Sequence, residues 1–275
     1  MTTREELVTY IHAALTAKRD QARVKFLRSK DEVGVRYCYV DDLLPASVAA
    51  RIHAVFPKSE NMRLMSSFRE VKYTTKNFDD FDPLLKDVTF AIQDPRIVNV
   101  VETITGIAGQ IPDPTLYAGG LSLMSKKHFL NPHIDNSHDG SRRYYRTLNL
   151  LYYVTPGWEL ANGGNLELWN TTVRRNVTIV SQYNRLVLME TNPWSWHSVS
   201  PVRVEGERCC VSNYYFSPMS PIGYGYFNVT SFSARPEQKL RRAAAWVDNR
   251  LRQAVRYILP GGLGKRDIYK EGAKK

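Results

Sequence analysis

Between residues 115 and 217, short runs rich in Val, Leu, Tyr and Thr alternate with clusters of turn-forming residues. The runs recur at a regular spacing, and no helical pattern intervenes between them. This arrangement is typical of a β-sandwich or barrel. The clusters that punctuate it are Asn131-Pro132, Asp139-Gly140, Pro156-Gly157, Asn162-Gly163-Gly164 and Glu205-Gly206-Glu207.

Helical patterns precede this region. Thr3 and Glu6 have the spacing of a capping box ahead of apolar residues at helical spacing. A short apolar strand is expected near Val35–Val40, followed by a helix that Pro45 opens. Asp94-Pro95 is typical of a further helix start. We expect these helices to cover one sheet of the β region.

The pattern predicts a mainly β (α+β) protein with three parts. Residues 1–36 form an N-terminal helical segment, residues 37–234 form the β domain, and residues 235–275 form a basic helical extension. The 275 residues suffice for one large domain, and 43% of them are hydrophobic, as in ordinary soluble proteins.

Cysteine usage and the N-terminus bear on the compartment. No apolar run approaches the roughly 18 residues that a membrane span requires. The first ten residues lack the layout of a secretory signal, and the three cysteines include no CxxC pair. We therefore expect a cytoplasmic protein without a disulfide framework or a cysteine zinc site.

The net charge of +11 is unevenly distributed along the chain. Residues 235–275 contain 12 Lys+Arg against 4 Asp+Glu, a charge of +8, and residues 1–36 contain 8 against 5, a charge of +3. The predicted β domain is therefore neutral overall. A neutral centre argues against nucleic acid as the partner and directs the search for chemistry to the β domain.

His133 and Asp135 are separated by one residue on an expected strand, so their side chains share a face. His197 follows 64 residues later, at the start of another expected strand. Two histidines and one carboxylate are the ligands of the facial triad that holds non-haem Fe(II) with open coordination positions. The same ligands also suit zinc or manganese.

Two arginines follow His197 and precede the apolar run Cys209–Phe216. An arginine that points into a β-barrel is costly unless it meets an anion, and its planar guanidinium suits a carboxylate. Arg208 directly precedes the strand and is the better candidate, with Arg203 as its competitor.

At these residues the chain resembles the Fe(II)/2-oxoglutarate-dependent dioxygenases, in particular their prolyl 4-hydroxylase-like branch. The resemblance covers roughly residues 37–217 and rests on several motifs in the same order. These are Tyr39–Pro45, His133–Asn136, Arg146–Val154, Trp158, Gly163–Leu166, His197–Pro201, Gly206–Arg208 and Tyr214–Phe216.

The resemblance implies a double-stranded β-helix (jelly-roll) core and three cofactors or co-substrates: Fe(II), 2-oxoglutarate and O2. It assigns His133, Asp135 and His197 to iron, and Arg208 to the distal carboxylate of 2-oxoglutarate. Asn149 and Tyr153 fall where the family has further co-substrate contacts. Two departures stand out: the family often has threonine where this chain has Asn149, and the strand before His133 has no clear match for the family's co-substrate tyrosine.

The implied reaction is hydroxylation of an unactivated C–H bond, coupled to conversion of 2-oxoglutarate to succinate and CO2. The carboxylate of Asp135 favours hydroxylation, or a related oxidation, over the halogenation of relatives that have a small residue there. A prolyl or other amino-acid or peptide substrate, free or within a protein, is the favoured class. Two alternatives remain open: a lipid- or glycan-linked or other small-molecule substrate, and a catalytically inactive barrel that binds an anionic partner.

The C-terminal extension contains an apolar stripe at spacings of three and four residues, flanked by arginines. The favoured interpretation is a basic amphipathic helix whose stripe packs on the barrel. An anionic membrane surface or a partner at this helix is the alternative, with a peripheral membrane location if the former holds. The oligomeric state is left open. The stripe consists of Leu240, Ala244, Val247, Leu251, Ala254 and Ile258.

Overall fold

The computed structural model describes residues 2–75, 77–117, 119–258 and 269. Its helical elements are α1 (Arg4–Ala17), α2 (Arg19–Arg28), α3 (Lys30–Val33), α4 (Ala46–Ala54), η1 (Ser59–Asn61), η2 (Phe78–Asp80), α5 (Pro83–Ala91), α6 (Pro95–Thr105), η3 (Leu160–Asn162) and α7 (Lys239–Ile258). Within these ranges, no helix is both long and apolar enough to cross a membrane.

The strands begin with β1 (Tyr37–Val40), β2 (Arg63–Ser66), β3 (Glu70–Thr74), β4 (Ile111–Pro112), β5 (Gly120–Met124), β6 (Phe129–Ile134) and β7 (Tyr145–Tyr153). They continue with β8 (Leu166–Trp169), β9 (Asn176–Ile179), β10 (Arg185–Glu190), β11 (His197–Val199), β12 (Arg208–Ser217) and β13 (Ser231–Phe232). Every described pairing between them is antiparallel.

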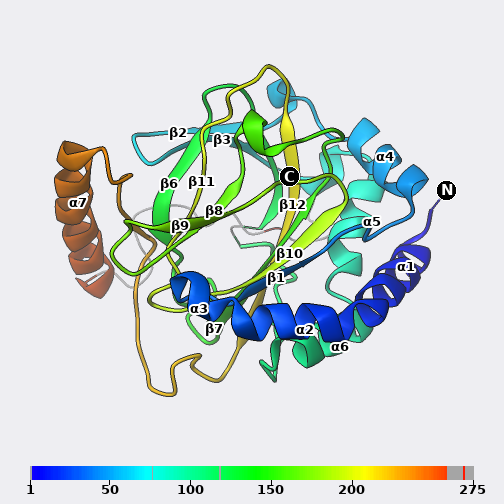
Figure 1. Ribbon diagram of the computed structural model, residues 1–275, viewed down its shortest axis with the longest axis horizontal. Helices are drawn as coiled ribbons and strands as arrows, with labels where there is room; N and C mark the ends of the chain where they lie inside the picture. The colour runs from blue at the N-terminus through cyan, green and yellow to red at the C-terminus, as the bar shows by residue number, and fades with distance from the viewer. Residues whose placement is uncertain (1, 76, 118, 259–268, 270–275) are drawn as a thin grey trace.

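The strands form one strongly curled sheet in the order β1-β10-β7-β12-β5-β3-β6-β11-β8-β9 (Figure 1). β3 pairs with β5 on one part and with β6 on the other, so the sheet folds over at β3 and its two halves face each other. This curled sheet with flanking helices confirms the predicted mainly β, jelly-roll class.

The N-terminal helices form as their caps predict. Thr3 accepts a hydrogen bond from the backbone of Glu6, whose side chain accepts one from the Thr3 backbone, and this completes the capping box of α1. The Asp94 side chain caps α6, and Gly106 ends that helix in the left-handed conformation, with φ +69°. The sequence signals at both helix ends are therefore confirmed.

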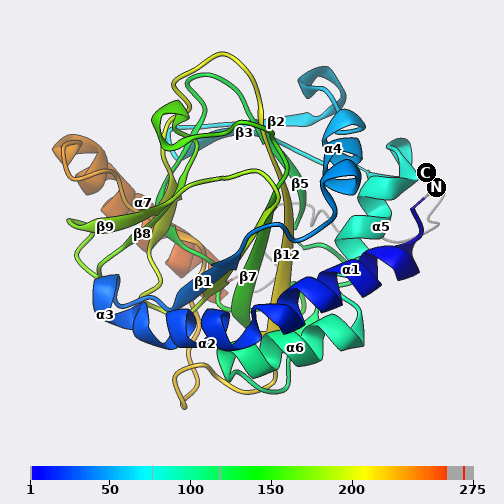
Figure 2. The ribbon, with the colours of Figure 1, turned by 45° about the vertical axis from the view of Figure 1, so that its right-hand side comes forward.

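Helices α1, α2, α5 and α6 cover the outer face of the β1-β10-β7-β12 half of the sheet (Figure 2). The alternation along β7 shows the division between the two faces: Leu148, Leu150 and Tyr152 are buried against the helices, and the intervening residues point inward. Burial of the outer face against helices leaves the inner face of the barrel free to form a site.

One expected turn lies within a strand. Asn131-Pro132 belongs to β6, where the pairing with β11 shifts register between His133 and Leu130. Proline lacks a backbone N–H, so in a sheet it is tolerated at such an irregularity. The prediction of a turn here is therefore wrong, although the residues do disturb the regular pairing.

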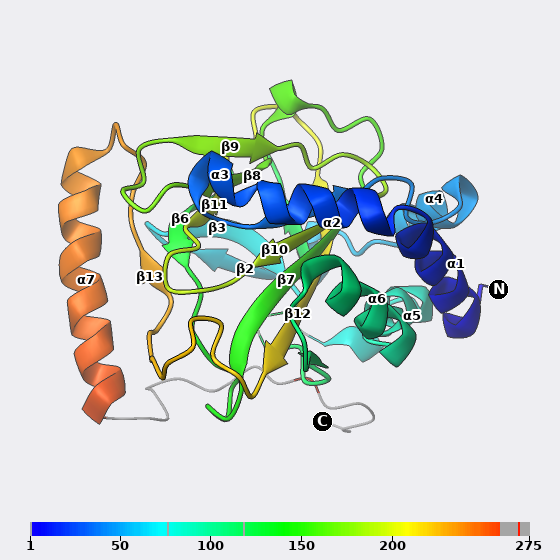
Figure 3. The ribbon, with the colours of Figure 1, turned by 60° about the horizontal axis from the view of Figure 1, so that its bottom comes forward.

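Helix α7 packs on the opposite side of the barrel from the N-terminal helices, beside β13 (Figure 3). Its apolar stripe does not pack on the barrel: Leu240, Val247 and Leu251 are exposed. The favoured packing interpretation is therefore wrong for these residues. The side chain of Ile258 and residues 259–268 and 270–275 of the predicted extension lie outside the described part of the chain.

Candidate active site

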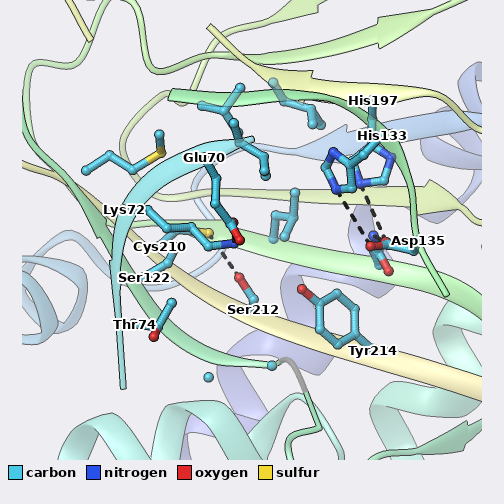
Figure 4. Close-up of a pocket in the computed structure, with 18 of the residues that line it drawn as sticks. Glu70, Lys72, Thr74, Ser122, His133, Asp135, His197, Cys210, Ser212 and Tyr214 are labelled. Atoms are coloured by element: carbon cyan, nitrogen blue, oxygen red, sulfur yellow. Dashed lines mark hydrogen bonds and ion pairs between the residues drawn. The ribbon is translucent and has the colours of Figure 1, made fainter. Parts of the chain in front are cut away.

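The inner face of the barrel encloses a cavity of about 230 Å³. Its walls are built from alternate residues of the strands around it, because side chains at positions i and i+2 of a strand share a face. On β12 these are Arg208, Cys210, Ser212 and Tyr214, and on β3 they are Glu70, Lys72 and Thr74 (Figure 4).

His133 and His197 lie directly opposite each other on β6 and β11, and Asp135 follows one residue after the end of β6. One nitrogen of each imidazole and one carboxylate oxygen lie within 4.8 Å of one another, and Figure 4 shows both rings pointing toward Asp135. Nε2 of His133 is 3.7 Å and Nε2 of His197 is 3.5 Å from the Asp135 carboxylate. The structure thus brings together the three residues of the predicted triad.

The other nitrogen of each imidazole is bound by the backbone. Nδ1 of His133 lies 3.0 Å from the Asn131 carbonyl, and Nδ1 of His197 lies 2.9 Å from the Ser195 carbonyl. A carbonyl can only accept, so each Nδ1 carries a proton, and each Nε2 is turned toward the Asp135 carboxylate. Burial and the neighbouring imidazole of His197 lower the pKa of His133 to about 3, so this ring is neutral.

The carboxylate of Asp135 is held ionised in a half-buried position. Burial alone opposes its ionisation, but Arg146 and the two imidazoles, together with Asn149, hold the pKa of the carboxyl well below its usual range. Arg146 Nη1 lies 3.0 Å from Asp135 Oδ2, and Asn149 Nδ2 donates to the same oxygen at 2.8 Å. Two imidazoles and one carboxylate, all oriented by further contacts, suit a divalent cation such as Fe(II).

The sequence reasoning missed Arg146, which is buried and lines the cavity. Its guanidinium lies 4.0 Å from the centre of the Tyr214 ring. Strict alternation from Asn149 would point Thr147 inward, but the pairing of β7 with β12 shifts register between Tyr215 and Phe216. Thr147 is the extra residue of this bulge, so Arg146 takes the inward position.

Arg208 also lies in the cavity wall, and its side chain is buried. Nη2 is 2.8 Å from the sulfur of Met124, a weak acceptor, and Nε has no hydrogen-bond partner among the described residues. The guanidinium lies 5.4 Å from the centre of the Tyr153 ring. A buried cation with an unpaired donor indicates an anion site at this end of the cavity.

The structure separates the two arginine candidates. Arg203 is exposed on the loop before β12, and its backbone N–H donates to the Asn162 carbonyl, whereas Arg208 faces inward. Asn149, expected at the co-substrate, contacts the Asp135 carboxylate, and its Oδ1 has no partner among the described residues. Tyr153 lies beside Arg208 in the wall of the cavity.

Among the other cavity residues that sequence reasoning missed are Glu70, Lys72 and Tyr214. Lys72 Nζ pairs with Glu70 at 2.9 Å, and the Tyr214 hydroxyl points into the cavity (Figure 4). Alternation from Arg208 along β12 would have identified Tyr214. No comparable signal marks Glu70 and Lys72, because β3 reaches the site through pairing that the sequence does not reveal.

Residues 119–216 match the family model of the 2OG-Fe(II) oxygenase superfamily. A curated relative, prolyl 3-hydroxylase OGFOD1 of Mus musculus, is 29% identical over 79 residues, which are 26% of this chain and 14% of that protein. The chain thus corresponds to only a small part of the length of this relative.

Two solved structures share the fold. A prolyl-4-hydroxylase of Pseudomonas putida has a TM-score of 0.53 at 14% identity, over 71% of this chain and 98% of that one. A structure from the study of prolyl 4-hydroxylases of Phytophthora capsici has a TM-score of 0.53 at 18% identity, over 90% and 75%. Residues 119–216 are therefore similar to the 2OG-Fe(II) oxygenase superfamily, and the fold agrees with that similarity.

Proposed function

We propose that this protein is an Fe(II)- and 2-oxoglutarate-dependent dioxygenase that hydroxylates an unactivated C–H bond. The observation that carries the proposal is the convergence of two imidazole nitrogens and one carboxylate in a cavity of a domain that matches the superfamily model. The substrate, 2-oxoglutarate and O2 would yield the hydroxylated substrate, succinate and CO2. One oxygen atom enters the alcohol and the other enters succinate.

His133, Asp135 and His197 would hold the metal, which supplies the activation of O2 when bound. Contacts within the protein hold these three side chains in position for metal binding. Backbone carbonyls fix both imidazole tautomers, and Arg146 keeps the carboxylate ionised and oriented. The donors therefore need little reorganisation on binding.

Arg208 would bind the distal carboxylate of 2-oxoglutarate, with Tyr153 beside it. The unpaired Nε supports this role, because a carboxylate would satisfy a donor that the described residues leave without a partner. Asn149 would orient the Asp135 carboxylate through its hydrogen bond to that group. Its unpaired Oδ1 would offer a second polar contact in the same cavity. Apolar residues, among them Leu151, complete the wall and help to exclude water.

A prolyl or other amino-acid or peptide substrate is the favoured class. The curated relative and the two solved structures are named as prolyl hydroxylases, which supports this preference. The same fold and metal site can serve unrelated substrates, since substrate choice depends on the residues around the mouth of the cavity.

The proposal is tested by succinate release from purified protein supplied with Fe(II), 2-oxoglutarate and O2. The wild type is expected to form succinate slowly without a substrate and faster with a suitable one. His133→Ala is expected to abolish both rates, and His12→Ala, which alters a histidine of helix α1, should leave them unchanged. Equal succinate formation by wild type and His133→Ala would refute the metal assignment.

A second arm of the experiment addresses the substrate class. Prolyl peptides, free amino acids and lipid- or glycan-linked molecules are compared by the increase in succinate and by a mass gain of one oxygen atom in the substrate. Stimulation by prolyl peptides alone supports the favoured class. If the wild type binds Mn(II) but never forms succinate, the alternative of an inactive barrel is supported instead.

A further inference from the structure

Helix α7 presents its polar side to the protein and its apolar side outward. Asn249 exchanges two hydrogen bonds with the backbone of Phe232, and Asp248 pairs with Arg69. Arg242 donates to the carbonyls of Thr172 and Val173. The helix is thus attached to the barrel mainly through polar groups, which reverses the usual arrangement of a surface helix.

The outward side of α7 carries the apolar stripe. Leu240 is 89% exposed, Leu251 is 63% exposed and Val247 is 50% exposed, and Ala244 and Ala254 of the same stripe are also exposed. An apolar surface of this continuity, rimmed by charged residues, marks an interaction site rather than an ordinary solvent face.

The charge beside the stripe is positive. Lys239 and Arg250 are exposed next to Leu240 and Leu251. The sequence of α7 contains six basic residues and a single acidic one, Asp248, whose carboxylate is directed at Arg69. Acidic groups of this helix therefore do not offset the positive charge along the outward face.

We propose that α7 binds an anionic lipid surface, with the stripe inserted among the acyl chains and the exposed Lys239 and Arg250 at the headgroups. A helix with an apolar face and basic flanks suits this position in the plane of the membrane interface. Each basic residue near an anionic leaflet favours binding by about fivefold. Leu240, Val247 and Leu251 supply the apolar contact.

A second copy of the chain fits this surface poorly. Paired α7 helices would bring two strongly basic segments together, which like-charge repulsion opposes. A helix of this length presents a face of about 30 Å by 10 Å, or roughly 300 Å², well below the roughly 800 Å² that each partner buries in a standard interface. Charge and area therefore both favour the lipid surface.

Lipid binding would also affect the orientation of the catalytic domain. β13 lies between α7 and β6, and Phe232 of β13 lines the cavity. A membrane under α7 would therefore lie next to the β13 side of the barrel. This inference does not depend on the proposed reaction, because it uses none of the residues assigned to the metal or to 2-oxoglutarate.

The test is flotation of the full chain with vesicles of phosphatidylcholine alone or with about a third phosphatidylglycerol. We expect at least tenfold tighter binding to the anionic vesicles, and weakening in about 0.5 M NaCl, where the Debye length falls to about 4 Å. Leu240→Glu/Leu251→Glu should reduce binding tenfold or more. Leu160→Glu is the matched control because Leu160 is 58% exposed and belongs to a different element, η3.

Lys239→Glu is a second variant, which tests the charge and is expected to weaken binding to the anionic vesicles alone. Thermal unfolding and succinate release should be unchanged in every variant, so loss of binding would not reflect loss of folding. Equal binding to both vesicle types, equal loss in Leu160→Glu, or retained binding in the double variant would overturn the proposal. Self-association that the double variant abolishes, without vesicle binding, would assign the stripe to a second copy instead.

Discussion

His133 and His197 are cross-strand partners on β6 and β11, and the centres of their rings are 4.0 Å apart. This register, rather than a long flexible loop, brings together two residues that are 64 positions apart in the sequence. Asp135 completes the set because it is two residues from His133 and therefore on the same face. The geometry of the site thus depends on the pairing of two short strands.

The first prediction concerns the arginine that would bind 2-oxoglutarate. Arg208→Ala removes a buried guanidinium and should weaken 2-oxoglutarate binding by about 1.5–3 kcal/mol, or roughly 10- to 150-fold in Kd, as for other charge-assisted hydrogen bonds. The affinity is measured by calorimetry in the presence of Mn(II), so that turnover does not interfere.

Arg203→Ala is the matched control, because the exposed Arg203 side chain should contribute little to binding. The same calorimetry should therefore return a wild-type Kd. A larger loss of affinity in Arg203→Ala than in Arg208→Ala would show that Arg203, and not Arg208, binds the carboxylate of 2-oxoglutarate.

The sequence allowed prediction of the residues whose placement follows from local periodicity. His133 and Asp135 share a face because they are two residues apart, and Arg208 points inward at the first position of β12. Arg146 escaped prediction because a one-residue bulge reversed the facing of β7 at that point. A bulge of this kind depends on the partner strand, so no pattern within β7 itself indicates it.

The orientation of α7 could not be predicted for a related reason. Periodicity indicated an amphipathic helix, and the expectation that its apolar side faces the barrel rests on the usual behaviour of surface helices. Here the barrel offers backbone groups of Phe232 and an arginine, Arg69, at the contact, and these select the polar side of the helix. The outcome depends on the surface of the barrel and not on the helix alone.

The second prediction concerns Asn249, which supports β13 from outside the cavity. Its side chain accepts from the Phe232 N–H at 2.8 Å and donates to the Phe232 carbonyl at 2.6 Å, and the Phe232 ring stacks on His133. Asn249→Ala should free this strand at a cost of about 1–3 kcal/mol and weaken Mn(II) binding several-fold. Mn(II) affinity is followed by electron paramagnetic resonance.

Lys239→Ala, an exposed position on the same helix, should leave Mn(II) affinity at the wild-type value. If Asn249→Ala also binds Mn(II) as the wild type does, then the support that α7 gives to β13 does not reach His133.

The third prediction compares two glycines that both have a positive φ. Gly163 has φ +71°, and a Cβ there would lie 2.0 Å from the carbonyl oxygen of Pro201, whereas Gly157 has φ +65° and open space around it. Gly157→Ala should cost about 1 kcal/mol, the strain of a left-handed residue. Gly163→Ala should cost about 3 kcal/mol or more, because two backbone segments must move apart.

Urea unfolding of the two variants measures this difference directly. The contact between the segments at Gly163 and Pro201 holds the loop that precedes Arg208. Similar losses of unfolding free energy in Gly163→Ala and Gly157→Ala would mean that the loop adjusts freely at this point.

The fourth prediction concerns the three cysteines, which are all free and buried. Burial raises the pKa of Cys209 to about 12 and also raises the pKa values of Cys38 and Cys210. A thiol reagent at pH 8 should therefore label none of them in the native protein and all three after denaturation, because the thiolate is the reactive form.

The same shifts determine how stability changes with pH. Below the unfolded-state pKa of about 8.5, the thiols are protonated in both the folded and the unfolded state. In that range they do not make the free energy of unfolding depend on pH. Above that pH the unfolded chain loses thiol protons while the native Cys209 keeps its proton until about pH 12. The free energy of unfolding should therefore fall by up to about 1.4 kcal/mol per pH unit for each buried thiol.

Urea unfolding at pH 8 and at pH 9.5 measures this slope, and Cys209→Ala isolates the contribution of one thiol. The variant should lose less stability than the wild type between the two pH values, because it has one group fewer that ionises on unfolding. Other alkaline effects, such as tyrosine ionisation, are common to both proteins and cancel in the comparison. Identical slopes would show that burial does not raise the pKa of Cys209 in the folded protein, and the native thiol should then be labelled at pH 8 as well.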